Sequence, residues 1–446
     1  MTVEPAPAGI AAPDTRRPAP EAGPGGADPA PAGMAGPAGG PGPDGAEPAL
    51  VVATLLRGSG ATGVETHIRE VVAFAAGRGA PATVVTPFSW VMPVAAPVFG
   101  ARLAIDRVSP AAGVAWYRYW HRQVLQAALS RALAQTPHAV VYAHCPPSAH
   151  AALRARRSTS QRVVMAVHFD QSQADEWVDK GRIRPRTKVY DAIRRLEAEV
   201  IPALDGIVFL SPSSRAALVG WLPAVEDLPS IVIPNFIQDA PGPGAGGRAG
   251  AGPAGGELVS VGGLEPAKNH AFLLQVLAEA NRLGRRCSLD IVGDGPCRAQ
   301  LRAQVTALGL EGQVRLLGYR ADVRSLLPRY RLYVHASTRE VMALAPIEAL
   351  AAGLPVVAAP VGGFAEMVDP GVEGLFWSVD DAGGAARLLI GLLEDRARLA
   401  RMSAAARARF TRGLDAAVVA PRLFDFLRSV SCRPRPGNAR RDGGSP

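Results

Sequence analysis

The sequence predicts an α/β protein with two Rossmann-like, doubly wound domains that face each other across a central cleft. Its length of 446 residues suits two domains of roughly 100–200 residues each. In both halves, short runs rich in Val, Ile and Leu alternate with segments of helical period, as in parallel sheets covered on both faces. A stretch of Gly, Pro and Ala at 239–256 separates the halves and has the composition of a flexible linker.

Ten strands follow from this alternation. In the first half they are 49–56, 82–86, 139–144, 163–168 and 206–210, with helices at 64–77 and 114–133. In the second half they are 258–261, 288–292, 314–317, 331–336 and 355–359. Ligands of such folds bind at the carboxyl ends of the strands, so the site is expected between the two sheets.

Both ends of the chain have compositions that cannot form a core. Of residues 1–48, 34 are Pro, Gly or Ala, so burial cannot offset the entropy of ordering and a disordered tail is predicted. Residues 431–446 combine four arginines with Pro and Gly and predict a second, basic disordered tail. The two domains are therefore expected at 49–238 and 257–430.

Composition narrows the class of protein. The hydrophobic fraction of 48% excludes a chain that is disordered throughout, and a net charge of +9 suits an anionic small ligand or a membrane surface as readily as nucleic acid. The N-terminus lacks the apolar core of a signal peptide, and the four cysteines form no CxxC pair and no metal-ligand spacing. We therefore expect a cytoplasmic protein with no metal site.

The most informative segment is 331–366, where strand, loop, helix and strand follow one another. Pro346 suits the first turn of the helix and Gly353 its C′ position. Glu340 then lies in the loop and Glu348 in the first helical turn, with both carboxylates facing one cleft. Carboxylates of this kind accept hydrogen bonds from sugar hydroxyls, while a helix N-terminus receives phosphates. The alternative is an exposed Glu340 and a Glu348 that only complements the helix dipole.

A second glycine-rich turn follows the strand at 258–261. Gly262 and Gly263 open the turn, and Asn269 is placed to cap the next helix. Lys268 then lies beside the positive end of that helix, where an ammonium and backbone amides can together neutralise a diphosphate leaving group. The alternative is an ordinary turn with an exposed lysine.

Together these segments resemble the retaining glycosyltransferases of family 4 (group 1), whose fold is GT-B. The likeness covers nearly all of 50–428, and the E-x7-E spacing from Glu340 to Glu348 is its specific part. The matching segments are GATGVETH (60–67), VYAHCPP (141–147), VVMAVH (163–168), VIPN (232–235), VGGLEPAKN (261–269), DIVGDGP (290–296), RLLGYRADV (315–323) and EVMALAPIEALAAGLPVVAAPVGGFAEMV (340–368).

On the donor side, the resemblance implies that Glu340 contacts the transferred sugar as a catalytic residue. It also implies that Glu348 holds the ribose hydroxyls and that Lys268 binds the diphosphate. The other expected donor-binding residues are glycines of two turns and two nearby cations: Gly262, Gly263, Gly362, Gly363, Arg320 and Arg339.

On the acceptor side, the resemblance implies that the turn from Gly60 to Gly63 approaches the donor phosphate and the acceptor. His168 ends a strand and is expected to project into the cleft as a second catalytic residue, with His144 close to the acceptor. The other two histidines of the matching segments and of the strand at 331–336 are expected to be mainly structural: His67 and His335.

Two departures from the family pattern bear on the chemistry. Gly263 occupies the position where the family usually has an arginine that shares the diphosphate with the lysine, so we expect another cation to substitute for it. Arg339 is the first candidate and Arg320 the second; the alternative is an Arg339 that is exposed or paired with a carboxylate. The glycines that usually follow the first glutamate are also absent, since Val341, Met342 and Ala343 stand there.

The function implied is transfer of a hexose-type sugar from a UDP- or GDP-sugar to a hydroxyl of a small-molecule, glycan or lipid-linked acceptor, with retention of configuration. No cofactor is expected, and the absence of a DxD motif agrees with a metal-independent reaction. No nucleic acid partner is expected. Peripheral contact with the inner membrane face through the helix at 114–133 or the basic residues of 180–188 is a further expectation, with core packing of that helix as the alternative. The alternative functions are a GT-B sugar-nucleotide epimerase or hydrolase, and a catalytically weak sugar-nucleotide-binding protein.

Overall fold

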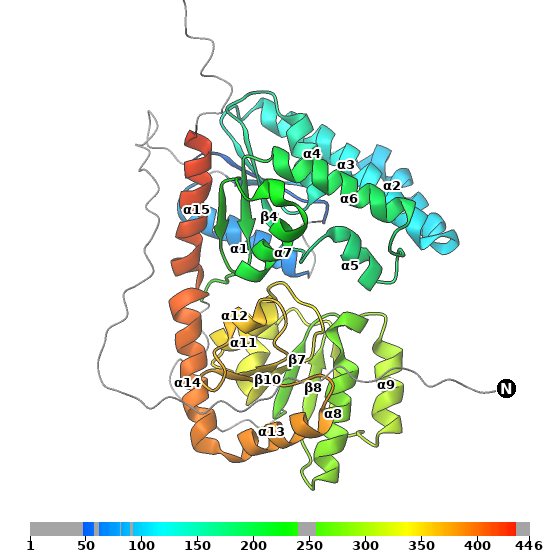
Figure 1. The fold of residues 1–446 in the computed structure, drawn as a ribbon, viewed down its shortest axis with the longest axis vertical. Coiled ribbons are helices and arrows are strands. Elements are labelled where there is room, and N and C mark those ends of the chain that lie inside the picture. The colour runs from blue at the N-terminus through cyan, green and yellow to red at the C-terminus, as the bar shows by residue number, and fades with distance from the viewer. Residues whose placement is uncertain (1–47, 58–61, 81, 90–91, 240–255, 434–446) are drawn as a thin grey trace, which may run out of the picture. The chain divides into compact units, whose positions relative to one another are not determined.

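The computed structural model describes residues 48–57, 62–80, 82–89, 92–239 and 256–433 (Figure 1). They belong to one compact unit, Gly42–Pro446. The predicted tail at 1–48 and linker at 239–256 lie almost wholly outside the described residues, as does the basic tail beyond residue 433. The paragraphs below concern the described residues.

The first half contains a parallel sheet of six strands in the order β2-β1-β3-β4-β5-β6. The strands are β1 (Leu50–Ala53), β2 (Ala82–Val85), β3 (Val140–Ala143), β4 (Arg162–Val167), β5 (Gly206–Phe209) and β6 (Ser230–Val232). All residues of β1, β3, β4 and β5 are buried, because helices cover both faces of the sheet. The five strands predicted here are confirmed, and the three-residue edge strand β6 is an addition.

Helices lie on both faces of this first sheet. They are α1 (Gly63–Gly77), α2 (Met92–Val108), α3 (Pro110–Ala134), α4 (Pro146–Ala155), α5 (Gln173–Asp179), α6 (Lys188–Val200) and α7 (Pro212–Trp221), with 3-10 turns η1 (Ile201–Ala203) and η2 (Pro223–Val225). Because side chains alternate along a strand, Val51 packs with α3 and α4 on one face, while Val52 packs with α1 on the other.

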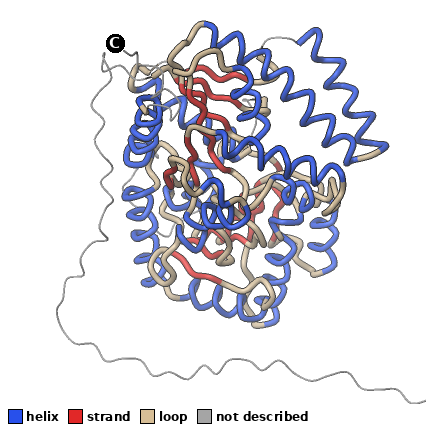
Figure 2. The backbone as a smooth tube through the Cα atoms, turned by 45° about the horizontal axis from the view of Figure 1, so that its top comes forward, coloured by secondary structure: helices blue, strands red, loops and turns tan. Residues whose placement is uncertain are grey.

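The second half contains another parallel sheet of six strands, in the order β12-β11-β10-β7-β8-β9. The strands are β7 (Leu258–Val261), β8 (Leu289–Val292), β9 (Val314–Gly318), β10 (Leu332–His335), β11 (Val356–Ala358) and β12 (Gly374–Phe376). The five strands predicted here are confirmed, and β12 is an addition. In each half the strands lie inside and the helices outside (Figure 2).

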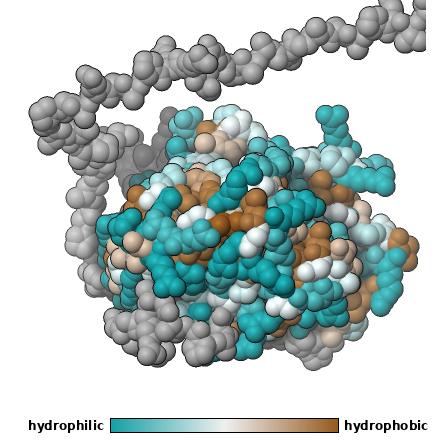
Figure 3. Space-filling model, turned by 90° about the horizontal axis from the view of Figure 1, so that it is seen from below, coloured by the Kyte–Doolittle hydropathy of each residue, from teal (hydrophilic) through white to brown (hydrophobic). Residues whose placement is uncertain are grey.

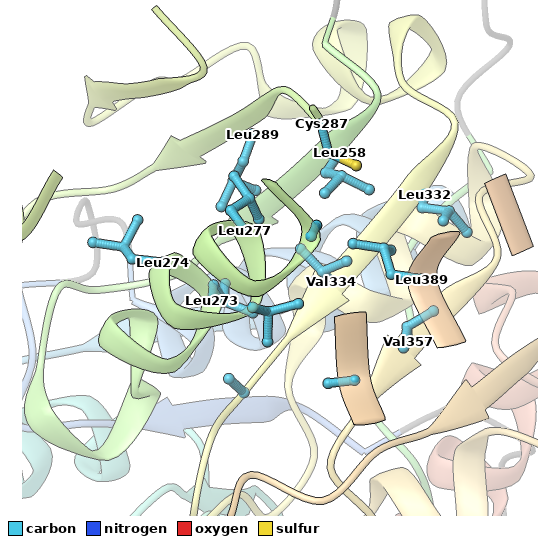
Figure 4. Close-up of a cluster of buried hydrophobic side chains, with 14 of the residues drawn as sticks. Leu258, Leu273, Leu274, Leu277, Cys287, Leu289, Leu332, Val334, Val357 and Leu389 are labelled. Atoms are coloured by element: carbon cyan, nitrogen blue, oxygen red, sulfur yellow. The ribbon is translucent and has the colours of Figure 1, made fainter. Parts of the chain in front are cut away.

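The helices of the second half enclose its sheet in the same way. They are α8 (His270–Arg282), α9 (Arg298–Ala307), α10 (Val323–Leu326), α11 (Leu344–Ala351), α12 (Phe364–Met367), α13 (Ala382–Glu394) and α14 (Arg396–Gly413), with η3 (Pro266–Lys268) and η4 (Leu327–Arg329). Figure 4 shows Leu273 and Leu277 of α8 in one apolar cluster with Leu258 and Val334 of the strands and Leu389 of α13. Burial of such side chains on both faces drives the assembly of the sheet.

The last helix, α15 (Ala416–Cys432), does not pack with the second half, although the sequence grouped residues 257–430 in one domain. Its apolar face, which includes Leu423 and Phe426, joins the core around Leu50 and Val140. A Cβ at Gly206 of β5 would come within 3.2 Å of Phe426, so glycine permits this close approach. Figure 1 shows α14 beside the second half and α15 beside the first. With α15 the chain therefore returns to its first sheet.

The surface gives the expected membrane contact no support. Helix α3 buries Leu125, Leu129 and Leu133 against the first sheet, so core packing, the alternative, describes it. Hydrophilic and hydrophobic side chains are intermixed on the face seen in Figure 3. Among the residues that the structure describes, no helix is both long and apolar enough to cross a bilayer.

Candidate active site between the two sheets

A cavity of about 1220 Å³ lies where the carboxyl ends of both sheets meet. The first half contributes His168 and the segment 170–182, and the second half contributes Lys268, the loop at 339–345 and Glu348. Its volume exceeds the range of roughly 300–1,000 Å³ usual for one small ligand. The cavity therefore has room for a sugar nucleotide and part of an acceptor.

Glu340 lies in the loop after β10, as predicted, and its side chain is only 14% exposed. One carboxylate oxygen, Oε2, accepts a hydrogen bond from the Lys268 ammonium. Burial alone would raise the pKa of the Glu340 carboxyl, but the charge of Lys268 and the neighbouring His335 overcome that effect and hold the pKa at about 2. Glu340 is therefore an anion at neutral pH.

Lys268 ends the 3-10 turn η3 and reaches across to Glu340 from the glycine turn of Gly262 and Gly263, which also lines the cavity. The amide of Thr338 donates to the carbonyl of Ala267 at 2.9 Å, which ties the two loops together. Asn269 stands at the start of α8, as predicted, but in the left-handed conformation (φ 49°) with no capping bond from its side chain. The prediction of a side-chain cap was wrong, because a capping side chain reaches the first helical amides from an extended backbone, which Asn269 does not have.

Glu348 also faces the cavity, and its side chain is 15% exposed. Helix α11 begins at Leu344, two residues before Pro346, so Glu348 lies one turn into the helix and not in its first turn as predicted. Arg324 of α10 donates to Glu348 at 3.3 Å and to Glu70 of α1 at 2.6 Å. Burial raises the pKa of the Glu348 carboxyl, although Arg324 partly opposes the shift. Sequence reasoning missed Arg324, which directly follows the matching segment 315–323.

Both predicted substitutes for the missing arginine line the cavity, and each is paired with a carboxylate. Arg339 lines the cavity, but its guanidinium pairs at 2.5 Å with Asp179 of α5, which is the alternative stated for it. Arg320 also lines the cavity, and its Nε and Nη2 donate to Asp322, at 2.8 and 2.7 Å. Each guanidinium keeps N–H donors that its carboxylate does not use, but the carboxylate already offsets its charge.

Two predicted donor-binding glycines support a loop and do not line the cavity. A Cβ on Gly362 (φ 50°) would lie 1.6 Å from the carbonyl oxygen of Glu340, and one on Gly363 would lie 2.2 Å from that of Val341. The amide of Gly363 also donates to the Val341 carbonyl at 2.8 Å. These glycines hold the Glu340 loop close to β11. On the acceptor side, Gly63 lines the cavity, whereas Gly60 is outside the described residues.

Three histidines of the first half lie together at the end of its sheet. His168 lines the cavity, as predicted, and its Nε2 is 2.9 Å from Nδ1 of His144. His144 is 3% exposed and lies behind His168, so it is not itself a cavity residue. His67 of α1 contacts the hydroxyl of Tyr142 at 3.3 Å. Burial lowers the pKa of all three imidazoles, which are therefore neutral at pH 7.

These imidazoles are also the one group of metal-ligating side chains found within the described ranges. The donor atoms of His67, His144 and His168 lie within 4.8 Å of one another. A transition metal bound by all three would require nitrogens about 3.3 Å apart, given bonds of about 2.0–2.1 Å in a tetrahedral site. It would also break the hydrogen bond between His144 and His168. In the structure His144 holds His168 through that hydrogen bond, and the ring of His67 packs against both.

His335, which sequence reasoning treated as mainly structural, also lines the cavity. Its Nε2 lies 3.5 Å from Oε2 of Glu340 and 2.7 Å from Oγ of Ser337. The signal that could have identified it is its place at the end of β10, five residues before Glu340.

Comparison with known proteins agrees with this geometry. The family described as "Glycosyltransferase Family 4" matches residues 61–240, and "Glycosyl transferases group 1" matches residues 254–409. A glycogen synthase of Mycobacterium tuberculosis is 28% identical over 285 residues, which are 63% of this chain and 66% of that protein. A D-inositol 3-phosphate glycosyltransferase of Thermobispora bispora is 32% identical over 269 residues, 56% of this chain and 63% of that protein.

Solved structures share the fold. A sucrose-phosphate synthase of Thermosynechococcus elongatus has a TM-score of 0.66 at 17% identity and covers 86% of this chain and 99% of its own. The Anabaena protein HepE, in complex with UDP-glucose, has a TM-score of 0.60 at 18% identity and covers 85% of this chain and 99% of its own. Each of these two structures therefore shares the fold over most of this chain.

Proposed function

We propose, since the chain belongs to the GT-B group 1 glycosyltransferases, that it transfers a hexose-type sugar. The donor would be a UDP- or GDP-sugar, and the acceptor a hydroxyl, with retention of configuration. The observation that carries the proposal is the contact between the anionic Glu340 and the Lys268 ammonium, in a cavity built from both sheets. The Glu340 carboxylate suits the positive charge that develops on the sugar, and the Lys268 ammonium suits the negative charge of the leaving diphosphate.

The second half supplies the groups for the donor. Lys268 would bind the diphosphate, and the open turn of Gly262 and Gly263 lets the phosphates approach the backbone. Glu348 would accept hydrogen bonds from the two ribose hydroxyls, in exchange for its contact with Arg324. The complex of HepE with UDP-glucose supports a donor of this class.

The transfer itself would occur on one face of the sugar. The bond from C1 to the phosphate oxygen breaks while C1 bonds to the acceptor oxygen on the same face, and the leaving phosphate oxygen takes the acceptor proton. Glu340 would stabilise the positive charge on the sugar ring. His168, neutral and held by His144, would hydrogen-bond the sugar or the acceptor hydroxyl. No step in this scheme uses a metal ion or a cofactor.

The acceptor would bind against the segment 170–182 of the first half. This wall offers carboxylates and the ring of Trp177, groups that suit a hydroxylated acceptor. A small molecule, a glycan and a lipid-linked sugar remain the candidate acceptors, and we propose the cytoplasm as the place of reaction.

Donor-dependent transfer by the purified chain tests the proposal. The chain is incubated with UDP- and GDP-sugars and a panel of glycan, polyol and lipid-linked acceptors, and the product anomer is read by NMR. Transfer with retained configuration is expected. Free sugar or an epimerised donor as the main product would support the hydrolase or epimerase alternative, and donor binding without any product would support a binding protein.

A further inference from the structure

Oε2 of Glu340 has one close hydrogen-bond donor and two further donor groups at a longer distance. Its partner is the Lys268 ammonium. Nε2 of His335 and Oγ of Ser337 each lie 3.5 Å from the same oxygen, at the outer limit of a hydrogen bond. Three donor groups therefore surround an oxygen that is now bound by Lys268.

The two more distant donors belong to a row of hydrogen bonds that begins at Tyr333. The hydroxyl of Tyr333 lies 3.1 Å from Nδ1 of His335, and Nε2 of His335 lies 2.7 Å from Oγ of Ser337. All three residues are at most 3% exposed. The Phe364 ring packs 4.8 Å from the imidazole, and Trp377 donates to the His335 carbonyl at 3.1 Å. The orientation of His335 is therefore set from both sides.

This chain can donate in one direction throughout. Burial lowers the pKa of His335, so the ring is neutral and carries one N–H. The Tyr333 hydroxyl is within reach of two acceptors, the Val261 carbonyl at 3.2 Å and Nδ1 of His335 at 3.1 Å. With the His335 proton on Nε2, that hydroxyl can donate to Nδ1, Nε2 donates to Ser337, and the Ser337 hydroxyl donates to Oε2 of Glu340. Every proton in the chain then points toward the carboxylate.

The Lys268 ammonium has three N–H donors, and a diphosphate would compete with Glu340 for them and for its charge. If its ammonium turns to a diphosphate, as the proposed function requires, Glu340 loses its only close donor while it stays buried. An unpaired buried carboxylate is costly. A donor that moves a few tenths of an ångström closer would offset that cost.

We propose that Ser337, oriented by His335, becomes the hydrogen-bond donor to Glu340 when a nucleoside diphosphate draws Lys268 away. His335 is then a positioning residue for the catalytic carboxylate. The inference rests on the proposed function, since it needs a diphosphate at Lys268. His335 acts through Ser337 and touches no substrate in this scheme.

The test is a double-mutant cycle on the binding of UDP and GDP, measured by calorimetry, with the tighter nucleotide used throughout. His335→Leu should weaken binding about tenfold, the size of one hydrogen bond to a charged group. In a Glu340→Gln background, where Lys268 is already released, the same change should have no effect. Ser337→Ala should behave as His335→Leu does, and His335→Gln should recover part of the loss because its amide can donate to Ser337.

His121→Leu is the matched control, since His121 is also buried, at 4% exposure, and stacks on Phe99 of α2. It should leave nucleotide binding unchanged. Equal losses from His335→Leu in both backgrounds would show a merely structural histidine and overturn the inference, as would full binding by both His335→Leu and Ser337→Ala. If the unmodified chain binds neither UDP nor GDP, the proposed function itself fails.

Discussion

Restoring the missing arginine tests whether the diphosphate site is short of positive charge. Gly263 lines the cavity, as Lys268 does, and a Cβ placed on it would have its nearest neighbours, Glu265 and the Asp294 carbonyl, at 3.8–3.9 Å, which is ordinary contact. Its backbone is not in the left-handed region, so a side chain costs no strain there. Gly263→Arg should therefore fold normally and present a guanidinium to the diphosphate.

The expected gain follows from one added charge-assisted hydrogen bond. Such a bond is worth about 1.5–3 kcal/mol, or about 10- to 100-fold in a dissociation constant. The carboxylate of Glu265 will compete for the new guanidinium, since its Cγ lies 3.8 Å from the added Cβ. We therefore expect UDP or GDP to bind about tenfold more tightly.

Calorimetric titration with the nucleotide measures this gain, and Gly263→Met is the control for side-chain length without charge. The gain should shrink in about 1 M salt, where the screening length falls to about 3 Å. Equal affinities for the arginine and methionine variants, or weaker binding by the arginine variant, would refute the view that the site lacks a cation.

Four further outcomes are expected. Glu348→Ala should raise the donor KM about tenfold with a smaller change in kcat, whereas Glu340→Ala should mainly lower kcat; equal, mild losses in steady-state kinetics would contradict both assignments. Arg339→Ala should change nucleotide affinity less than about threefold, since the Asp179 carboxylate already binds Arg339 and offsets its charge; a tenfold loss would assign Arg339 to the diphosphate. Excess EDTA should leave transfer unchanged; loss that Mn²⁺ restores would reject metal independence. Because the pKa of Glu340 is lowered from 4.5 to about 2, its stabilisation is present above pH 4.5 and lost as the pH falls toward 2; in urea titrations the stability advantage over Glu340→Gln should shrink across that window, and a constant difference would contradict the shift.

The strands and the two loops of the site are local properties of the sequence. A short apolar run forms a buried strand wherever helices cover it, which is why all ten predicted strands are present. Glu340 and Lys268 follow such strands directly, and parallel strands end at one edge of their sheet. Their place at one edge of the sheet could therefore be predicted, whereas spacing alone left an exposed Glu340 and an exposed Lys268 as alternatives.

The pairing of charges was decided only by the tertiary structure. An ion pair requires two groups within about 4 Å, and the packing of distant segments sets that distance. Arg324 and Glu70 are 254 residues apart, and Arg339 meets Asp179 from the other sheet. Nothing in the neighbourhood of either arginine in the sequence identifies its partner.

The packing of distant segments also decided which sheet α15 covers and which groups His335 contacts. The apolar stripe of α15 shows that the helix must be buried, but either sheet could have received it, and the face of the first sheet beside α1 is the one it fills. His335 looks like any buried strand residue until Ser337 and Glu340 are brought beside it. The sequence by itself thus determined which elements form and which strand ends carry chemistry, and the packing of distant elements decided which side chains meet.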